Sequence, residues 1–193
     1  MLVTAKTSRH SSRIGSTREA AQLAKAIFKY EDAGYEYFDR RSFMTFIPAG
    51  WTYLGGGVFR VAFRAPSGVV YKVANNKDND TLNKKEAEIF ARMAREVWIP
   101  TTTYYECDGL PIIAMPFLEN DGTKLNEHGA ELLDWMHNIV PDLHSGNYVV
   151  VNGRPIGRDV VGYDGLRSSG RFCGVCCKKH ARGRHSVKPL EYA

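Results

Sequence analysis

The segment Pro141-Asp142-Leu143-His144-Ser145-Gly146-Asn147 decides the expected fold of this chain. It is a polar stretch between a short amphipathic helix, expected over residues 131–139, and two short strands, expected near residues 148–151 and 155–156. A further aspartate, Asp159, comes twelve residues after the end of the segment. The loop and the strands after it therefore carry Asp142, Asn147 and Asp159 within a short span.

Strands are expected upstream of this loop. Residues 51–54, 58–64 and 69–73 are rich in β-branched and aromatic side chains, which is typical of strands. Gly55-Gly56-Gly57 separates the first run from the second, and Ala65-Pro66-Ser67-Gly68 is a turn between the second and the third. The pattern predicts an antiparallel meander that begins with a glycine-rich hairpin.

Two further elements are expected between the meander and the loop. Residues 81–95 carry apolar side chains along one helical face, so a helix follows the meander. Residues 101–107 and 110–118 have the pattern of a hairpin joined at Asp108-Gly109. The second strand of this hairpin is apolar throughout, which predicts a central position in the sheet.

The N-terminal region divides into two parts. Residues 1–15 are polar, basic and rich in serine and threonine, which predicts a flexible arm. Ser16 and Glu19 form a capping box, and apolar residues then recur at helical spacing. A helix is therefore expected over about residues 17–30.

The order of a glycine-rich hairpin, a strand lysine, a helix glutamate, an apolar strand, a helix and an Asp-containing loop resembles the protein-kinase fold. The resemblance covers about residues 50–165. It implies an α+β, minimal protein-kinase-like bilobal fold, in which an antiparallel N-lobe sheet with a helix precedes a truncated C-lobe. We expect a flexible basic arm (1–15), the N-terminal helix and N-lobe (16–118), a reduced catalytic C-lobe (119–168) and a Cys/His-rich basic tail (169–193).

The resemblance implies an ATP site. In the family, glycines let backbone N–H groups approach the phosphates, an aromatic residue caps the turn, and a strand lysine pairs with the α- and β-phosphates and with a helix glutamate. A lysine in an otherwise apolar strand also needs an anionic partner if it is buried. The matching residues are Gly55, Gly56, Gly57, Phe59, Lys72, Glu86 and Met115. Glu88 is the alternative partner of the lysine.

By the same resemblance, Asp142 is the catalytic base that accepts or orients the proton of the attacking hydroxyl. Asn147 and Asp159 are the implied magnesium ligands, since Mg²⁺ prefers hard oxygen ligands, and Asp164 competes with Asp159 for that place. Lys72 and Asn147 complete the implied catalytic set.

Three positions depart from the usual protein-kinase pattern. Arg60 replaces the third glycine of the hairpin, Val140-Pro141 stands where His-Arg is common, and Val160-Val161 stands where Phe-Gly is usual. The order Asp-Leu-His-x-Gly-Asn is close to that of small-molecule and atypical kinases. The compact chain is similar to the early serine/threonine protein kinases of T-seven-type short-tailed bacteriophages, which phosphorylate host proteins and themselves.

The resemblance thus implies an ATP- and magnesium-dependent transferase, a serine/threonine protein kinase that acts on host proteins and on itself during host takeover. Two alternatives stay open. The Asp-Leu-His-x-Gly-Asn order suggests a small-molecule phosphotransferase of the aminoglycoside or choline kind. The altered glycine and the Val-Val pair suggest a catalytically dead kinase fold that inhibits a host protein by binding it.

Composition fits a globular enzyme. With 193 residues, 44% hydrophobic and 24% charged, the chain can bury a core and is neither fibrous nor wholly disordered. The net charge of +5 lies partly at the two ends, which either attract phosphate-bearing partners, including ATP and nucleic acid, or simply solubilise the chain. The sequence shows no signal peptide or membrane span, so we expect a cytoplasmic protein, in the host cytoplasm if it is phage-encoded.

Three of the four cysteines crowd one short stretch, so reduced thiols are expected rather than a disulfide framework. The two-residue gap between Cys173 and Cys176 suits one half of a tetrahedral zinc site. Cys177 and His180 complete the candidate Zn²⁺ ligands, and Cys107 can join them. The alternative is a frayed basic tail with free thiols.

Overall fold

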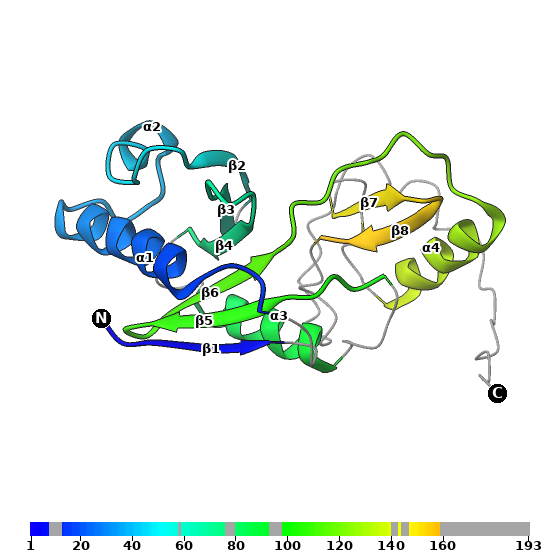
Figure 1. Ribbon diagram of the computed structural model, residues 1–193, viewed down its shortest axis with the longest axis horizontal. Coiled ribbons are helices and arrows are strands. Elements are labelled where there is room, and N and C mark those ends of the chain that lie inside the picture. The colour runs from blue at the N-terminus through cyan, green and yellow to red at the C-terminus, as the bar shows by residue number, and fades with distance from the viewer. Residues whose placement is uncertain are drawn as a thin grey trace.

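The computed structural model describes residues 1–7, 13–57, 59–75, 80–92, 98–139, 143 and 147–158. Within them, one six-stranded antiparallel sheet has the order β1-β5-β6-β4-β3-β2 (Figure 1). Its strands are β1 (Val3–Thr7), β2 (Thr52–Gly56), β3 (Arg60–Arg64), β4 (Val70–Ala74), β5 (Thr103–Cys107) and β6 (Leu110–Met115). The apolar strand β6 lies inside the sheet, as the sequence predicted.

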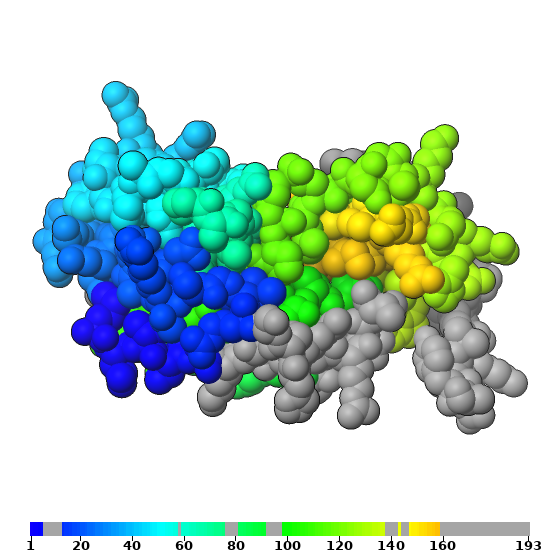
Figure 2. Space-filling model, viewed as in Figure 1, coloured from blue at the N-terminus to red at the C-terminus, as the bar shows by residue number. Residues whose placement is uncertain are grey.

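A two-stranded sheet and four helices complete the described fold. They are α1 (Thr17–Asp32), α2 (Arg40–Phe43), α3 (Asp80–Arg92), α4 (Glu127–Ile139), β7 (Tyr148–Val151) and β8 (Arg154–Gly157). In Figure 1, α1 and α2 lie at one end of the molecule, and α4 and the β7–β8 hairpin lie at the other. Figure 2 shows the segment that follows β6, in green, between these two groups. The architecture is α+β and is compatible with the minimal bilobal kinase-like arrangement expected from the sequence.

The large sheet separates two hydrophobic cores. Successive strand residues point to opposite faces, so alternate side chains enter different cores. Phe63 and Tyr71 pack with Leu23 of α1 on one face, whereas Ile113 packs with Ile89 of α3 on the other. Because Tyr71 faces α1, the next residue of β4, a lysine, faces α3.

Helix α1 begins where the capping box predicts. The backbone N–H of Glu19 donates to Ser16 Oγ at 3.1 Å, and the serine hydroxyl lies 3.2 Å from the Glu19 carboxylate. The hydroxyl of Tyr71 donates to the same carboxylate at 2.8 Å, which ties the start of α1 to β4. The prediction of this helix is confirmed.

The other predicted elements are also present. The meander is β2, β3 and β4, the helix after it is α3, and the hairpins are β5–β6 and β7–β8. Each hairpin turns at a residue of positive φ, Asp108 at 48° and Asn152 at 51°, which aspartate and asparagine tolerate better than most residues. Among the described residues, no helix has the length and apolarity needed to cross a bilayer.

The prediction of a flexible arm over residues 1–15 is wrong for Val3–Thr7. These residues form the edge strand β1, paired with β5 along its whole length. The N-terminus is held further by Asp108, whose side chain accepts the Leu2 N–H at 2.7 Å and whose own N–H donates to the Leu2 carbonyl at 3.0 Å. An open edge of the sheet supplied backbone partners that local composition does not reveal.

A hydrogen-bonded clamp joins the segment after β6 to the β7–β8 hairpin. Asp121 Oδ2 accepts the Asn152 N–H at 2.6 Å, and Asp121 Oδ1 accepts the N–H and hydroxyl of Thr123 at 2.9 and 2.5 Å. Asn120 Oδ1 accepts the Val150 N–H at 2.7 Å. The hydrogen bond from Asn152, aided by those from Thr123, lowers the pKa of Asp121.

Asp121→Asn is expected to lower the melting temperature at pH 7, because the amide cannot form charge-assisted hydrogen bonds. The pKa of Asp121 is lower in the folded chain than its usual value of 3.8, so its ionic contribution to stability is complete above that value. It is lost as the pH falls through the folded-state pKa. Melting curves of both proteins between pH 7 and pH 2.5 should therefore converge at acid pH. A difference in melting temperature between the two proteins that is the same at every pH would contradict this role of Asp121.

Gly129 marks a close contact between α4 and the β7–β8 hairpin. A β-carbon at this position would meet the carbonyl oxygen of Gly153, which is backbone and cannot rotate away. Gly129→Ala is therefore expected to destabilise the chain by about 1–3 kcal/mol, although alanine favours helices intrinsically. Urea unfolding should show this loss, while Glu131→Ala on the exposed side of the same helix should change stability by less than about 0.5 kcal/mol. A more stable Gly129→Ala protein would contradict the contact.

Candidate functional site

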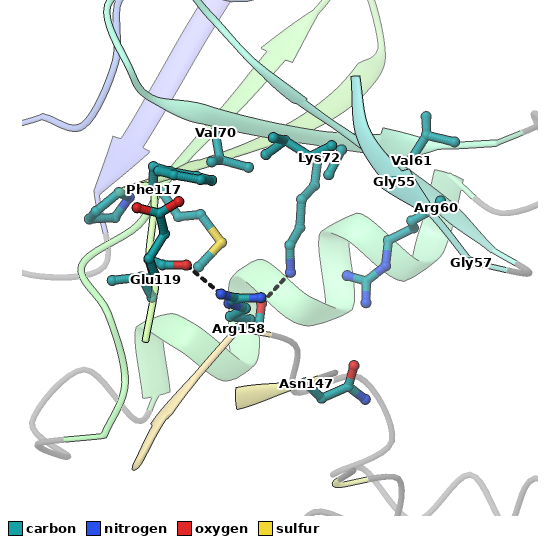
Figure 3. Close-up of a pocket in the computed structure, with 16 residues that line it drawn as sticks. Gly55, Gly57, Arg60, Val61, Val70, Lys72, Phe117, Glu119, Asn147 and Arg158 are labelled. Carbon is teal, nitrogen blue, oxygen red and sulfur yellow. Dashed lines mark hydrogen bonds between the residues drawn. The ribbon is translucent and has the colours of Figure 1, made fainter. Parts of the chain in front are cut away.

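A pocket of about 460 Å³ lies between the β2–β3 hairpin, the segment that follows β6, and the start and end of the β7–β8 hairpin (Figure 3). Its lining residues come from four places in the sequence that only the fold brings together. They are Leu54, Gly55, Gly56, Gly57, Arg60, Val61, Ala62, Val70, Lys72, Met115, Pro116, Phe117, Leu118, Glu119, Asn147 and Arg158. Eight of the sequence-predicted site residues are described, and six of them line this pocket: Gly55, Gly56, Gly57, Lys72, Met115 and Asn147.

The glycine-rich hairpin forms one wall of the pocket. A β-carbon at Gly56 would lie 2.9 Å from both Val61 Cγ1 and the Tyr53 hydroxyl, so these two side chains would have to shift to admit a larger residue here. The N–H of Gly57 donates to the Arg60 carbonyl at 2.8 Å and closes the turn. Phe59 is 53% exposed and does not line the pocket.

Lys72 extends from β4 into the pocket. It pairs in the sheet with Ala62 of β3 and Ile113 of β6, so its backbone is held on both sides. Its Nζ lies 3.3 Å from Oε1 of Glu86 and also donates to the backbone carbonyl of Arg158. The structure therefore contains the ion pair that the sequence predicted for the strand lysine and the helix glutamate.

Glu86 rather than Glu88 is the partner of Lys72. Glu86 lies on the face of α3 that packs against the sheet and is fully buried, whereas Glu88 is exposed. One turn earlier, the Asn83 amide donates to the Lys72 carbonyl at 3.1 Å and to the Pro111 carbonyl at 2.9 Å. Asn83 thereby holds α3 against β4 and β6, in the position that lets Glu86 reach the Lys72 side chain. The sequence analysis missed this residue, although a polar side chain at helical spacing from Glu86 was a usable signal.

Glu86 forms a second ion pair through its other carboxylate oxygen. The guanidinium of Arg60, at the start of β3, contacts Oε2 of Glu86 while Lys72 contacts Oε1. Both cationic side chains are only 10% exposed. In the sequence, Arg60 stood out only because it replaces a glycine of the expected pattern. In the folded chain it lines the pocket.

The floor of the pocket comes from the β7–β8 hairpin. The N–H of Arg158 donates to the Asn147 carbonyl at 2.7 Å, which holds the two ends of this hairpin together at the pocket. The Arg158 guanidinium donates to the Leu118 carbonyl at 2.5 Å. Burial lowers the pKa of this guanidinium, and the nearby Glu119 carboxylate partly opposes that effect. The sequence analysis did not assign Arg158 to the site.

Apolar side chains line another part of the pocket, near Glu119 (Figure 3). Met115, buried at the end of β6, and Val70 of β4 line it together with Phe117. The Arg64 guanidinium lies 4.1 Å from the centre of the Phe117 ring, a distance typical of a cation–π contact. Of these residues, the sequence analysis named only Met115.

Several predicted site residues lie outside the described part of the chain. These are Asp142, Asp159 and Asp164, and also Cys173, Cys176, Cys177 and His180 of the candidate zinc site. The described residues hold no cluster of three or more His, Cys, Asp or Glu side chains that suits a metal ion. Cys107 is a buried free thiol inside the core, and burial raises its pKa to about 11.

Comparisons with known proteins give one similar structure. No protein-family model matches the sequence, and no curated protein matches it either. Among solved structures, the ternary complex of streptomycin, ATP and APH(2″)-IIa is similar, with 14% sequence identity and a TM-score of 0.34. The match covers 62% of this chain and 40% of that one, so the chain spans less than half the length of the protein it resembles.

Proposed function

We propose that this chain is an ATP- and magnesium-dependent serine/threonine protein kinase that transfers the ATP γ-phosphate to protein hydroxyls. The observation that carries the proposal is the buried Lys72–Glu86 ion pair, which lies beneath a glycine-rich hairpin in a pocket that Asn147 also lines. An ion pair that served only the stability of the fold would not need an open pocket beside it. This one faces a pocket whose size lies within the range of about 300–1,000 Å³ for small-ligand sites.

The two ends of the pocket suit the two halves of a nucleotide. Val70 and Phe117 lie at one side in Figure 3 and offer apolar surface for a planar base. Lys72, Arg60 and the hairpin backbone lie toward the other side and offer positive charge for phosphates. We infer that adenine occupies the Phe117 end and the phosphates lie under the glycines. Exposed Phe59, at the tip of the hairpin, would cap the phosphates from outside.

The acceptor hydroxyl requires a base beside the terminal phosphate. Asp142 is proposed for that role, and it accepts the proton or orients the hydroxyl for in-line attack. Asn147 and Asp159 would hold Mg²⁺ through an amide oxygen and a carboxylate, a donor set that fits this hard cation. When bound, the cation neutralises charge on the phosphates. Lys72, held by Glu86, fixes the orientation of the phosphates for transfer.

The proposed acceptors are host proteins and the chain itself, in a host-takeover role in the host cytoplasm. The serines and threonines near the N-terminus are candidate self-phosphorylation sites: Thr4, Thr7, Ser8, Ser11 and Ser12. Thr4 and Thr7 belong to β1, which pairs with β5, so their modification would require this edge strand to detach. The expected N-lobe, C-lobe and tail boundaries are likewise proposals.

The test is transfer from γ-labelled ATP to three sets of acceptors by the purified chain with Mg²⁺. The sets are a cell extract, the chain alone, and a panel of aminoglycosides and small alcohols. Label on protein, lost on chelation of Mg²⁺, is the expected result. Label only on the small molecules would support the alternative suggested by the Asp-Leu-His-x-Gly-Asn order. ATP binding without any transfer would support a kinase fold that acts as a binding inhibitor.

A further inference from the structure

Arg158 connects two walls of the pocket. Its backbone follows β8, where its N–H donates to the Asn147 carbonyl at 2.7 Å and its carbonyl accepts from Lys72 Nζ. Its guanidinium reaches the segment after β6 and donates to the Leu118 carbonyl at 2.5 Å. Both dashed lines in Figure 3 meet at Arg158. The side chain of one residue therefore bridges the β7–β8 hairpin and the segment that follows β6.

The guanidinium contacts the pocket where the base of a nucleotide is proposed to bind. Leu118 follows Met115 and Phe117, whose apolar side chains line the proposed base site. A base also carries N–H donors, which need an acceptor once they leave water. The Leu118 carbonyl is such an acceptor, and Arg158 donates to it. A base that uses this carbonyl therefore competes with the guanidinium.

The contact between Arg158 and Leu118 is one that can open. Its acceptor is a neutral backbone carbonyl, so the contact is a charge-assisted hydrogen bond and not an ion pair. Burial lowers the pKa of the guanidinium, because this position disfavours the charged form, and the nearby Glu119 carboxylate offsets that effect only in part. Arg158 is half-buried, so its long side chain can turn toward solvent while its backbone stays bound to Asn147.

We propose that the Arg158 guanidinium is a latch that closes the base site on the Leu118 carbonyl and that moves away when a nucleotide binds. The inference rests on the proposed nucleotide site and adds its regulation, since binding of the base then includes the opening of one hydrogen bond. Removal of a latch strengthens nucleotide binding, whereas removal of a ligand weakens it. The sign of the change in affinity distinguishes the two roles.

The experiment measures dissociation constants for adenosine and ATP by isothermal titration calorimetry in the parent chain, Arg158→Met, Arg158→Ala and the control Arg154→Ala. Arg154 is an exposed arginine of β8 that does not line the pocket. Methionine keeps much of the arginine stem but cannot donate a hydrogen bond. Adenosine is the decisive ligand, because it is uncharged and has no direct Coulomb interaction with the lost charge. Arg158→Met should bind it about tenfold more tightly than the parent chain does, and Arg154→Ala should bind it equally well.

The same variants also test the latch without ligand. Loss of the bridge between Leu118 and the β7–β8 hairpin should lower the melting temperature of Arg158→Met by about 2–4 °C, whereas Arg154→Ala should melt as the parent chain does. The expected result is a lower melting temperature together with tighter adenosine binding. A side chain that only supported the fold would give the first change without the second.

Adenosine affinity that is unchanged or weaker in Arg158→Met would overturn the proposal. If this variant does not fold, Arg158→Ala decides by the same criterion, and failure of both to fold would also overturn it, because a latch opens without unfolding the chain. If the parent chain binds ATP and no Arg158 variant binds adenosine more tightly, the nucleotide site stands without the latch. If neither the parent chain nor any variant binds either ligand, the proposed function itself is wrong.

Discussion

Asp142→Asn is expected to reduce phosphate transfer from ATP by about 10²- to 10⁴-fold, the usual contribution of a general base. The amide keeps the shape of the carboxylate but cannot accept a proton, so ATP affinity should stay within about threefold of the parent chain. Steady-state transfer of label and ATP titration together measure the two quantities.

Two described residues, Leu143 and Asn147, follow Asp142 closely in the sequence. Leu143 is buried and packs with Phe90 and Met136, and Asn147 lines the pocket. Asp32→Asn serves as the matched control, because α1 contributes no residue to the pocket. Full activity in Asp142→Asn would exclude this residue from the mechanism and would leave the nucleotide site without its proposed base.

Glu86→Ala is expected to destabilise the folded chain by about 3–5 kcal/mol, since Glu86 is fully buried and breaking a buried ion pair is strongly destabilising. Here two cations, Lys72 and Arg60, lose their common carboxylate at once. Domains of this size are stable by only about 5–15 kcal/mol, so the variant should lose much of its stability to urea.

Lys72→Met separates stability from activity at the same place. Glu86 keeps Arg60 as its partner in this variant, so the loss of stability should be clearly smaller than for Glu86→Ala, whereas phosphate transfer should fall sharply. Glu88→Ala, on the exposed side of α3, is the control and should change stability by less than about 0.5 kcal/mol. Equal losses in Glu86→Ala and Glu88→Ala would mean that the buried ion pairs do not support the fold.

Most elements of the fold could be predicted from local sequence. The capping box located α1, the switch to short β-branched runs located the meander, and the continuous apolar run predicted the central strand β6. These signals are local because caps, turns and side-chain period depend on neighbouring residues. The edge strand β1 escaped prediction, since its partner β5 lies about a hundred residues away along the chain.

The candidate site also combines residues that could be predicted from the sequence with residues that could not. The strand lysine and its glutamate could be chosen from the sequence because a buried charge demands a partner, and Glu86 has the right place on α3. The roles of Arg60 and Arg158 could not, because nothing local distinguishes them from surface arginines. Their positions in the pocket depend on how β3 and β8 approach the same space.

By itself, the sequence determined the order of the elements, the glycine-rich hairpin and the need of Lys72 for an acidic partner, because each follows from contacts or costs within a short stretch of chain. Only the tertiary structure decided that Glu86 serves two cations, that Arg158 and Asn147 meet beside Lys72, and that the N-terminus joins the sheet. The physical reason is distance along the chain: pairing across the sheet and closure of the pocket depend on residues that approach one another only after folding.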